Sequence, residues 1–133
     1  MFYKNNVGKK GEISAEKYLK RKGYLFIARN YWTECGEIDL IFYKNFKLIF
    51  VEVKTRSSDT YGTGREAVDS VKQCNIKQTA EIFIRSHCLN NKAPFYLFKI
   101  PFRLKFFGIR YDVIEISSKN NYSVNAHLKT YFK

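Results

Sequence analysis

Cysteine is scarce in this sequence, and its spacing excludes the usual structural uses of the residue. The three cysteines, Cys35, Cys74 and Cys88, are odd in number and widely separated. No pair has the C-x-x-C spacing of a structural zinc site, and His87, next to Cys88, has no second ligand pair nearby. We therefore expect reduced cysteines with a structural role, as in a cytosolic chain.

Long hydrophobic runs are also missing. The apolar stretches are far shorter than the roughly 20 residues that span a membrane, and the N-terminus has no apolar segment typical of secretory signals. The sequence therefore predicts a cytoplasmic protein with no membrane partner. Its 133 residues are enough for one domain, residues 1–133, with a substantial buried core.

Acidic residues are the third shortage. Twelve Asp and Glu stand against 24 Lys and Arg, for a net charge of +12. Such an excess favours a polyanionic partner, and nucleic acid before a membrane surface, because no basic amphipathic helix stands out. The frequent Lys, Asn, Ile, Phe and Tyr also suit a protein encoded by an A/T-rich genome, which is the competing explanation.

What the chain does have is a strong hairpin signal over residues 36–56. Two runs rich in Ile, Val, Phe and Tyr flank a short polar turn, and the turn predicts a register in which partner numbers sum to 91. Asp39 would then face Glu52, and Glu37 would face Lys54. Alternation would leave the acids on one face and Ile38, Leu40, Phe42, Val51 and Val53 on the other, against one or both helices.

Two opposed carboxylates need a cation. Like charges directly opposite one another in a strand pair are destabilising, and a divalent metal with oxygen ligands would compensate them, with Lys54 as a second positive group. The alternative is an exposed face on which Asp39 and Glu52 are solvated and Glu37 pairs with Lys54.

The rest of the chain reads as an α/β single layer. Apolar spacing predicts helices over about residues 8–22 and from a capping box at Thr63–Glu66 to residue 87 or 88. Strands are expected at 24–30 and 109–116, with a connection at 31–35, a polar loop at 55–64 and a short terminal helix at 124–132. The expected order is α-β-β-β-α-β: a mixed sheet flanked by helices. In the second long helix we expect these residues inward: Ala67, Val71, Cys74, Ile76, Ala80, Phe83 and Ile84; and these outward: Lys72, Lys77 and Arg85.

A basic and aromatic segment covers about residues 92–109. No acid occurs between Glu81 and Asp112, whereas Lys and Arg alternate with Phe and Tyr. Pro101 predicts an edge strand or folded-over loop there. The composition suits phosphate neutralisation and base stacking; equally, the aromatic residues could belong to the core and the basic ones to a solvated rim.

Asp39, Glu52 and Lys54 resemble the three positions of the PD-(D/E)XK nuclease core, with Asp followed after twelve residues by Glu-Val-Lys. The wider sequence is similar to the small bacterial YraN-like proteins (UPF0102), described as endonuclease-like, over a core of about residues 8–116. Segment 92–109 is longer than that family implies, and 117–133 forms a tail. The matching residues are Gly11-Glu12, Ala15, Gly23-Tyr24, Arg29-Asn30, Gly36–Ile41, Phe50–Arg56, Gly62, Glu66–Val68, Lys72 and Arg110–Val113.

The resemblance implies a restriction-endonuclease-like core and a Mg²⁺- or Mn²⁺-dependent endonuclease that hydrolyses phosphodiester bonds in duplex or branched DNA. Asp39 and Glu52 would hold the metal, with the Val53 backbone carbonyl as an extra ligand and Glu12 acting on the metal or its water. Lys54 would act on the attacking water or the phosphate. Its likeness to Holliday-junction resolvases adds a homodimer to these expectations. Candidate phosphate contacts are Lys9, Lys10, Arg56, Arg65 and Lys72.

Two other functions stay open at this point. The chain could be a catalytically silent nucleic-acid-binding module that acts with a partner in DNA processing or uptake. It could also be a protein-interaction domain whose charge is incidental, in which case it would lack the steep salt dependence that phosphate contacts produce. For Glu12 alone, a carboxylate near a helix N-terminus is also favoured simply by the helix dipole.

Overall fold

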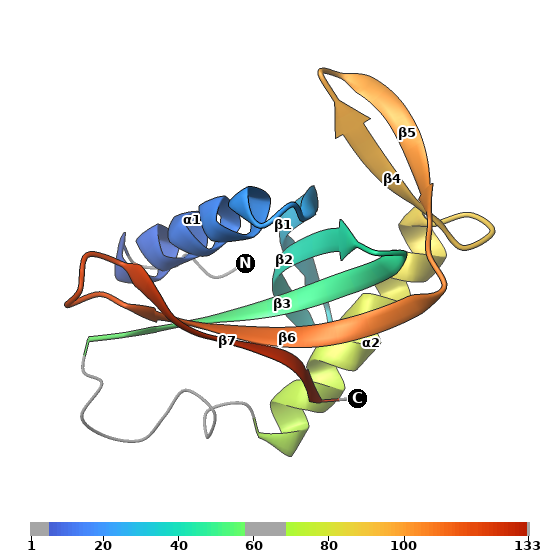
Figure 1. The fold of residues 1–133 in the computed structure, drawn as a ribbon. Helices are drawn as coiled ribbons and strands as arrows, with labels where there is room; N and C mark the ends of the chain where they lie inside the picture. Colours follow the sequence, from blue (N-terminus) through green and yellow to red (C-terminus); the bar gives the residue numbers. More distant parts are fainter. Residues whose placement is uncertain (1–5, 58–68, 133) are drawn as a thin grey trace.

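The structure is a computed structural model that describes residues 6–57 and 69–132. The described residues form two helices and seven strands (Figure 1). Their bounds are α1 (Asn6–Arg21), β1 (Leu25–Thr33), β2 (Gly36–Lys44), β3 (Lys47–Arg56), α2 (Ser70–His87), β4 (Lys92–Leu97), β5 (Ile100–Lys105), β6 (Gly108–Ser117) and β7 (Ser123–Phe132).

Five of the strands make one mixed sheet in the order β1-β2-β3-β6-β7. β3 and β6 are parallel, and the other neighbours are antiparallel. A parallel neighbour requires a crossover, and here the chain returns through α2. The predicted α/β class, with the order α-β-β-β-α-β, is confirmed.

The sheet is covered on both faces, and each face has its own apolar core. α1 contributes Ala15 and Leu19 to one cluster, which includes Leu40, Phe42 and Ile49 of the hairpin. α2 supplies the opposite cluster with Ile76, Ala80 and Phe83, which lie one helical turn or two apart. Residues buried on both faces explain why the central strands are almost continuously hydrophobic.

The predicted hairpin register is correct as far as Leu40 and Val51, but the β2–β3 ladder ends there, so the expected pairs of Asp39 with Glu52 and of Glu37 with Lys54 are not part of it. Pairs run from Lys44 with Lys47 to Leu40 with Val51, and every pair sums to 91. Asn45 and Phe46 form the two-residue turn, both with positive φ (51° and 62°). Such turns match the twist of the flanking strands, which is why the turn sets the register.

The prediction of one apolar face and one acidic face was only partly correct. Leu40, Phe42, Val51 and Val53 do pack together on the α1 side, but the opposite face is also largely apolar. Ile41 packs in the α2-side core, whereas Leu40 packs in the α1-side core, as alternation requires. Ile38 also lies on the α2 side, although alternation from Leu40 would place it with α1. The interruption falls at Asp39, beside the β1 residue Asn30, whose positive φ of 50° departs from strand geometry. A local departure of this kind is not visible in a period-2 pattern.

Three other expectations need correction. β1 continues to Thr33, so most of the connection expected at 31–35 is strand. The C-terminal segment is the edge strand β7 and not a helix; alternating Val124, Ala126 and Leu128 pair with β6. The loop predicted at 55–64 begins later, because Thr55 and Arg56 are the last residues of β3.

α2 also begins later than predicted. Its N-cap is Asp69, whose side chain accepts a hydrogen bond from the Lys72 backbone N–H at 2.8 Å. The capping box expected at Thr63–Glu66 and the inward position of Ala67 lie outside the described residues. Val71, which is 68% exposed, and Cys74 do not face the core as predicted, whereas Ile76, Ala80 and Phe83 do.

The basic aromatic segment is a hairpin of its own. β4 and β5 pair only with each other, in a second, two-stranded sheet. Figure 1 shows this hairpin standing away from the five-stranded sheet, beyond the C-terminal end of α2. Within the described residues, no helix combines the length and apolar character needed to cross a membrane.

Candidate functional site

The candidate site lies where β2 and β3 separate. Their ladder ends at Leu40 and Val51. Beyond that point the start of β2 pairs with β1, while Glu52–Arg56 pair with β6. The next residue on each side of this fork is an acid: Asp39 on β2 and Glu52 on β3. Polar side chains can enter the sheet here without interrupting a ladder.

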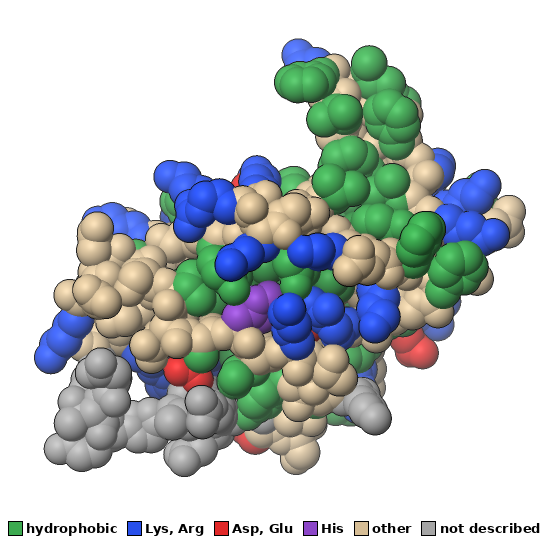
Figure 2. Space-filling model, in the orientation of Figure 1, with side chains coloured by type: hydrophobic (Ala, Val, Ile, Leu, Met, Phe, Trp, Pro, Cys, Tyr) green, Lys and Arg blue, Asp and Glu red, His purple; other side chains and the backbone are tan. Residues whose placement is uncertain are grey.

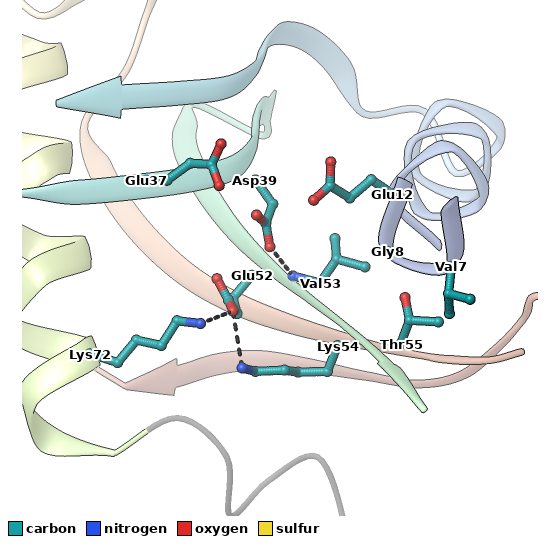
Figure 3. A pocket seen from close by; sticks show the side chains of 10 residues that line it. All are labelled: Val7, Gly8, Glu12, Glu37, Asp39, Glu52, Val53, Lys54, Thr55 and Lys72. Carbon is teal, nitrogen blue, oxygen red and sulfur yellow. Dashed lines mark hydrogen bonds and ion pairs between the residues drawn. The ribbon is translucent and has the colours of Figure 1, made fainter. Parts of the chain in front are cut away.

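Asp39 bridges the fork through its side chain. Its Oδ2 accepts a hydrogen bond from the Val53 backbone N–H at 2.8 Å, as Figure 3 shows. The carboxylate satisfies a strand N–H that β2 does not reach with a backbone carbonyl. This bond fixes Asp39 relative to β3 and brings it close enough to Glu52 for the two carboxylates to interact electrostatically.

Glu52 is buried and flanked by two ammonium groups. Its Oε2 lies 3.2 Å from Nζ of Lys54, on the same strand, and 2.7 Å from Nζ of Lys72, on α2. Figure 3 shows Lys72 reaching Glu52 from α2 and Lys54 reaching it from β3. Two carboxylates and two ammonium groups therefore balance within one small volume.

Burial is the largest single influence on the pKa of each of the three side chains Glu52, Lys54 and Lys72. Burial and, next, the Asp39 charge raise the pKa of Glu52, and the two lysines only partly oppose this effect. Burial also lowers the pKa of Lys54, and the like charge of Lys72 adds to this, against the attraction of Glu52. Burial acts to lower the pKa of Lys72 as well, but the Glu52 carboxylate outweighs it and the pKa is raised.

Glu12 reaches the site from α1. It is buried, and its Oε1 accepts a hydrogen bond from Nδ2 of Asn30 at 2.8 Å. The preceding residue explains the close approach of the helix: a Cβ at Gly11 would overlap Oγ1 of Thr55 on β3. Only glycine lets α1 lie this near the strand that carries Glu52.

These side chains surround one cavity of about 520 Å³. In Figure 3, carboxylates from β2, β3 and α1 and the lysines from β3 and α2 converge around it. Its lining comprises Val7, Gly8, Glu12, Glu37, Asp39, Glu52, Val53, Lys54, Thr55 and Lys72.

The donors suit a hard divalent cation. Carboxylate and backbone oxygens are the ligands that Mg²⁺ and Mn²⁺ prefer, and such an ion would relieve the cost of placing Glu52 beside Asp39 in a buried site. In the part of the chain that the structure describes, no three His, Cys, Asp or Glu side chains already form a group that could hold an ion. The pair Asp39 and Glu52 therefore fits a metal whose remaining ligands are backbone, Glu12 or water.

Comparison with known proteins places the chain in a family. The model of the family described as "Uncharacterised protein family UPF0102" matches residues 11–116. A UPF0102 protein of Alkaliphilus oremlandii is 36% identical over 127 residues, which cover 95% of this chain and 97% of that protein. The chain belongs to the UPF0102 family. A Clostridium botulinum relative is 38% identical over 93% of both chains, and one from Dictyoglomus thermophilum is 38% identical over 83% of this chain and 80% of its own.

The structure brings together the four residues that the sequence of this UPF0102 member singles out for chemistry. Glu12, Asp39, Glu52 and Lys54 all line the cavity. Val53 also lines it, and its backbone N–H is bound to Asp39. Their roles stay predictions, but their juxtaposition from α1, β2 and β3 is a structural fact.

The predicted phosphate contacts divide into three groups. Lys72 does not stay outside as expected from the helix pattern, because α2 directs it into the site of this UPF0102 chain. Lys9 and Lys10, near the start of α1, and Arg56, at the end of β3, are exposed, and none of the three lines the cavity. Arg65 lies outside the described residues.

Sequence reasoning missed several contributors in this UPF0102 chain. Glu37 lines the cavity, although it was predicted only as the cross-strand partner of Lys54. Asn30 holds Glu12, a role that was not predicted, and Lys72, predicted only as a phosphate contact, holds Glu52. Asn30 and Lys72 both fall among the residues that match the family, which was the only signal for them, since neither stands out by periodicity.

Proposed function

We propose that this protein is a metal-dependent endonuclease that hydrolyses phosphodiester bonds in DNA. One observation carries the proposal: Glu12, Asp39, Glu52 and Lys54, from three separate elements, meet around a single cavity in a chain of net charge +12. Carboxylates that hold a divalent ion, next to a lysine, suit an anionic substrate whose reaction develops further negative charge.

The proposed cofactor is Mg²⁺ or Mn²⁺, held by Asp39 and Glu52, with the Val53 carbonyl and Glu12 as further ligands directly or through water. When bound, such an ion supplies a Lewis acid and a bound water of lowered pKa. The hydrogen bond from Val53 N–H keeps Asp39 oriented toward β3, and Asn30 keeps Glu12 in place. These contacts pre-organise the acids before substrate arrives.

Lys54 has the protonation chemistry that the reaction needs. Because burial lowers its pKa, its ammonium gives up a proton more readily than an exposed lysine does. As the neutral amine, after its proton has passed to solvent, Lys54 can accept a proton from the attacking water; as the ammonium it can stabilise negative charge on the phosphate. Lys72 pairs with Glu52 at 2.7 Å, and it could turn to a phosphate oxygen if a bound ion compensated that carboxylate in its place.

Cleavage assays test this proposal. Labelled single strands, duplexes, flaps and four-way junctions would be incubated with Mg²⁺, Mn²⁺ or EDTA, using the parent, Glu52→Ala and Lys54→Ala. We expect metal-dependent products from the parent and at least ~100-fold slower cleavage by each variant. Lys77→Ala and Glu81→Ala, on α2, are matched controls that should cleave at the parental rate.

A second function has one observation in its favour. The two ammonium groups beside Glu52 already offset the charges of Asp39 and Glu52, and among residues 6–57 and 69–132 no three His, Cys, Asp or Glu side chains form a group that could hold an ion. These features suit a nucleic-acid-binding module that acts with a partner and does not cleave. DNA binding that persists in both site variants, without products from any substrate, would favour this module over the nuclease.

A further inference from the structure

The β4–β5 hairpin is an arm that the candidate site does not use. It pairs with no strand of the five-stranded sheet, and it projects from the body of the molecule (Figure 1). A two-stranded hairpin has little stability by itself. The arm therefore depends on its anchorage, and its outer half is available for a partner.

The base of the arm is held firmly. Ala93 is fully buried in the α2-side core. The Tyr43 hydroxyl donates a hydrogen bond to the Lys105 carbonyl at 2.6 Å, and Arg103 Nη1 donates to the His87 carbonyl at 3.1 Å. Contacts with β2 and α2 thus set the direction in which the arm points.

The two faces of the arm differ in chemistry. Its cross-strand pairs and strand alternation place Lys92, Tyr96, Arg103 and Lys105 on one face, together with two prolines. The opposite face is wholly apolar: Ala93, Phe95, Leu97, Ile100, Phe102 and Leu104. Figure 2 shows apolar side chains running along the projecting hairpin, with Lys and Arg at its tip and beside its base.

The tip carries an aromatic ring into solvent. Phe98 and Lys99 form the turn with φ of 50° and 66°, a conformation for which Asn and Gly are the favoured residues. Phe98 is 90% exposed, and Tyr96 just before it is 68% exposed. A structural turn alone gives no reason for a fully exposed ring and a cation at these two positions.

We propose that the β4–β5 arm binds nucleic acid where paired and unpaired strands meet, with Phe98 stacked on an unpaired base. Charge complementarity selects this partner: the arm has four basic residues, Lys92, Lys99, Arg103 and Lys105, and no acid. The basic face neutralises phosphates while the apolar face and tip cover exposed bases. Arm-to-arm contact with a second copy of the chain would account for the apolar face alone, because the arm has no acid that could pair with the basic face.

The arm stands at the end of the hairpin opposite the candidate site. Phe107, which follows the arm, donates its backbone N–H to the Phe46 carbonyl at the β2–β3 turn. Glu52 lies five residues beyond Lys47 along β3, or about 17 Å away. One substrate can therefore contact both. As a statement about substrate class the inference rests on the proposed function, but binding by the arm needs no cleavage.

Fluorescence anisotropy in EDTA tests the arm directly. A single strand, a blunt duplex and a duplex with a single-stranded overhang would be titrated with the parent and with Phe98 variants. We expect the overhang duplex to bind the parent more tightly than the blunt duplex does. Phe98→Ala and Phe98→Leu should weaken overhang binding roughly 5- to 150-fold with little change for the blunt duplex, whereas Phe98→Trp should bind like the parent.

The controls separate stacking from charge and from folding. Val71→Ala removes another exposed apolar side chain, on α2, and should not alter binding. Lys99→Gln, at the tip and away from the anchoring contacts, should reduce the salt slope of log affinity by about 0.7–0.9. Unchanged melting temperatures would show that the Phe98 variants are folded.

Three results would contradict the proposal that the arm binds nucleic acid through Phe98. They are equal affinity for blunt and overhang duplexes, parental binding by Phe98→Leu, or sedimentation of the parent as a dimer that Phe98→Ala dissociates. All three readouts are independent of turnover. If the Phe98 variants lose affinity and no DNA is cleaved, the binding role of the arm is supported and the nuclease proposal is wrong. If DNA is cleaved and the Phe98 variants bind like the parent, the nuclease is supported and the binding role of the arm is wrong.

Discussion

At the scale of single residues, the site depends on an electrostatic balance around Glu52. A buried carboxylate lies beside Asp39 and is offset by Lys54 and Lys72. Removing Asp39 relieves the repulsion on Glu52, whereas removing Lys54 or Lys72 leaves the carboxylates less compensated in a poorly solvated place. Substitutions at the four positions should therefore change stability as well as activity, and in opposite directions for different residues.

Asp39→Asn should abolish metal binding yet raise the melting temperature in EDTA. The amide oxygen can still accept the Val53 N–H bond, while the repulsion that raises the pKa of Glu52 disappears. We expect a gain of roughly 0.2–1 kcal/mol in the free energy of unfolding. Thermal melting with and without Mn²⁺ measures both effects.

Asp39→Ala is the matched comparison. It removes the same charge but also leaves the Val53 N–H without its acceptor, which should cost about 1–3 kcal/mol. A lower melting temperature for Asp39→Asn than for the parent in EDTA would show that the carboxylate pair is not destabilising, and the electrostatic argument for a bound cation would lose its basis.

At the scale of elements, the site depends on how closely α1 approaches β3. Gly11 faces Thr55 with no room for a Cβ, and the next residue, Glu12, lines the cavity. The helix therefore cannot be shifted without moving a candidate catalytic carboxylate. A sequence pattern shows Gly11 only as a poor helix former, since the strand it touches is 44 residues away.

Gly11→Ala should destabilise the protein by about 1–2 kcal/mol, because overpacking against Thr55 outweighs the gain in helix propensity. It should also slow cleavage by displacing Glu12. Chemical denaturation measures the first effect and the cleavage assay the second.

Thr55→Ala in the Gly11→Ala background should restore part of both losses, since Oγ1 of Thr55 is the nearest atom to the added methyl group. Gly108→Ala is the control, because there a Cβ would meet only Lys47 Cγ at an ordinary 3.7 Å. Equal destabilisation by Gly11→Ala and Gly108→Ala would contradict the close-approach argument.

At the scale of the whole molecule, a buried ionic cluster joins the last strands to α1. Asp112 on β6 receives two hydrogen bonds from Arg110, at 2.8 and 2.9 Å. His127 Nε2 on β7 lies 2.8 Å from Asp112, and its Nδ1 lies 3.2 Å from the Tyr18 hydroxyl on α1. The C-terminal edge strand is therefore part of the core assembly.

Asp112→Asn should lower the free energy of unfolding by about 3–5 kcal/mol at neutral pH, because it leaves the Arg110 guanidinium without its counterion. Although burial acts to raise it, the pKa of Asp112 is lowered by His127 and Arg110. Its stabilising contribution is thus present above the ordinary aspartate pKa and is lost as the pH falls through the lowered value.

The difference in unfolding free energy between parent and Asp112→Asn should therefore be largest near neutrality and shrink in acid. Denaturation at a series of pH values measures it, with Glu81→Gln, an exposed acid, as the control. A difference that stays constant down to strongly acidic pH would show that the loss comes from packing and not from charge.

The expectations that succeeded were local ones. The turn at Asn45 and Phe46 set the hairpin register, and uniform apolar runs marked the central strands. Those that failed depended on distant neighbours. The C-terminal segment becomes a strand because it pairs with the edge of β6. The change of face between Leu40 and Ile38 occurs at Asp39, beside the irregular residue Asn30 of β1. Residue propensity and periodicity describe only neighbours along the chain, so they predict neither the pairing of β7 with β6 nor the change of face at Asp39.

The sequence by itself determined the excess of positive charge, the α-β-β-β-α-β order of the core and the hairpin register, because composition, turn chemistry and strand patterning are written along the chain. It also supplied the candidates Glu12, Asp39, Glu52 and Lys54, through their resemblance to a family motif. Only the tertiary structure decided that Lys72 binds Glu52, that Asn30 holds Glu12, and that the aromatic residues of the arm face solvent. The physical reason is that these outcomes depend on distances between separate elements, which are set by packing and burial.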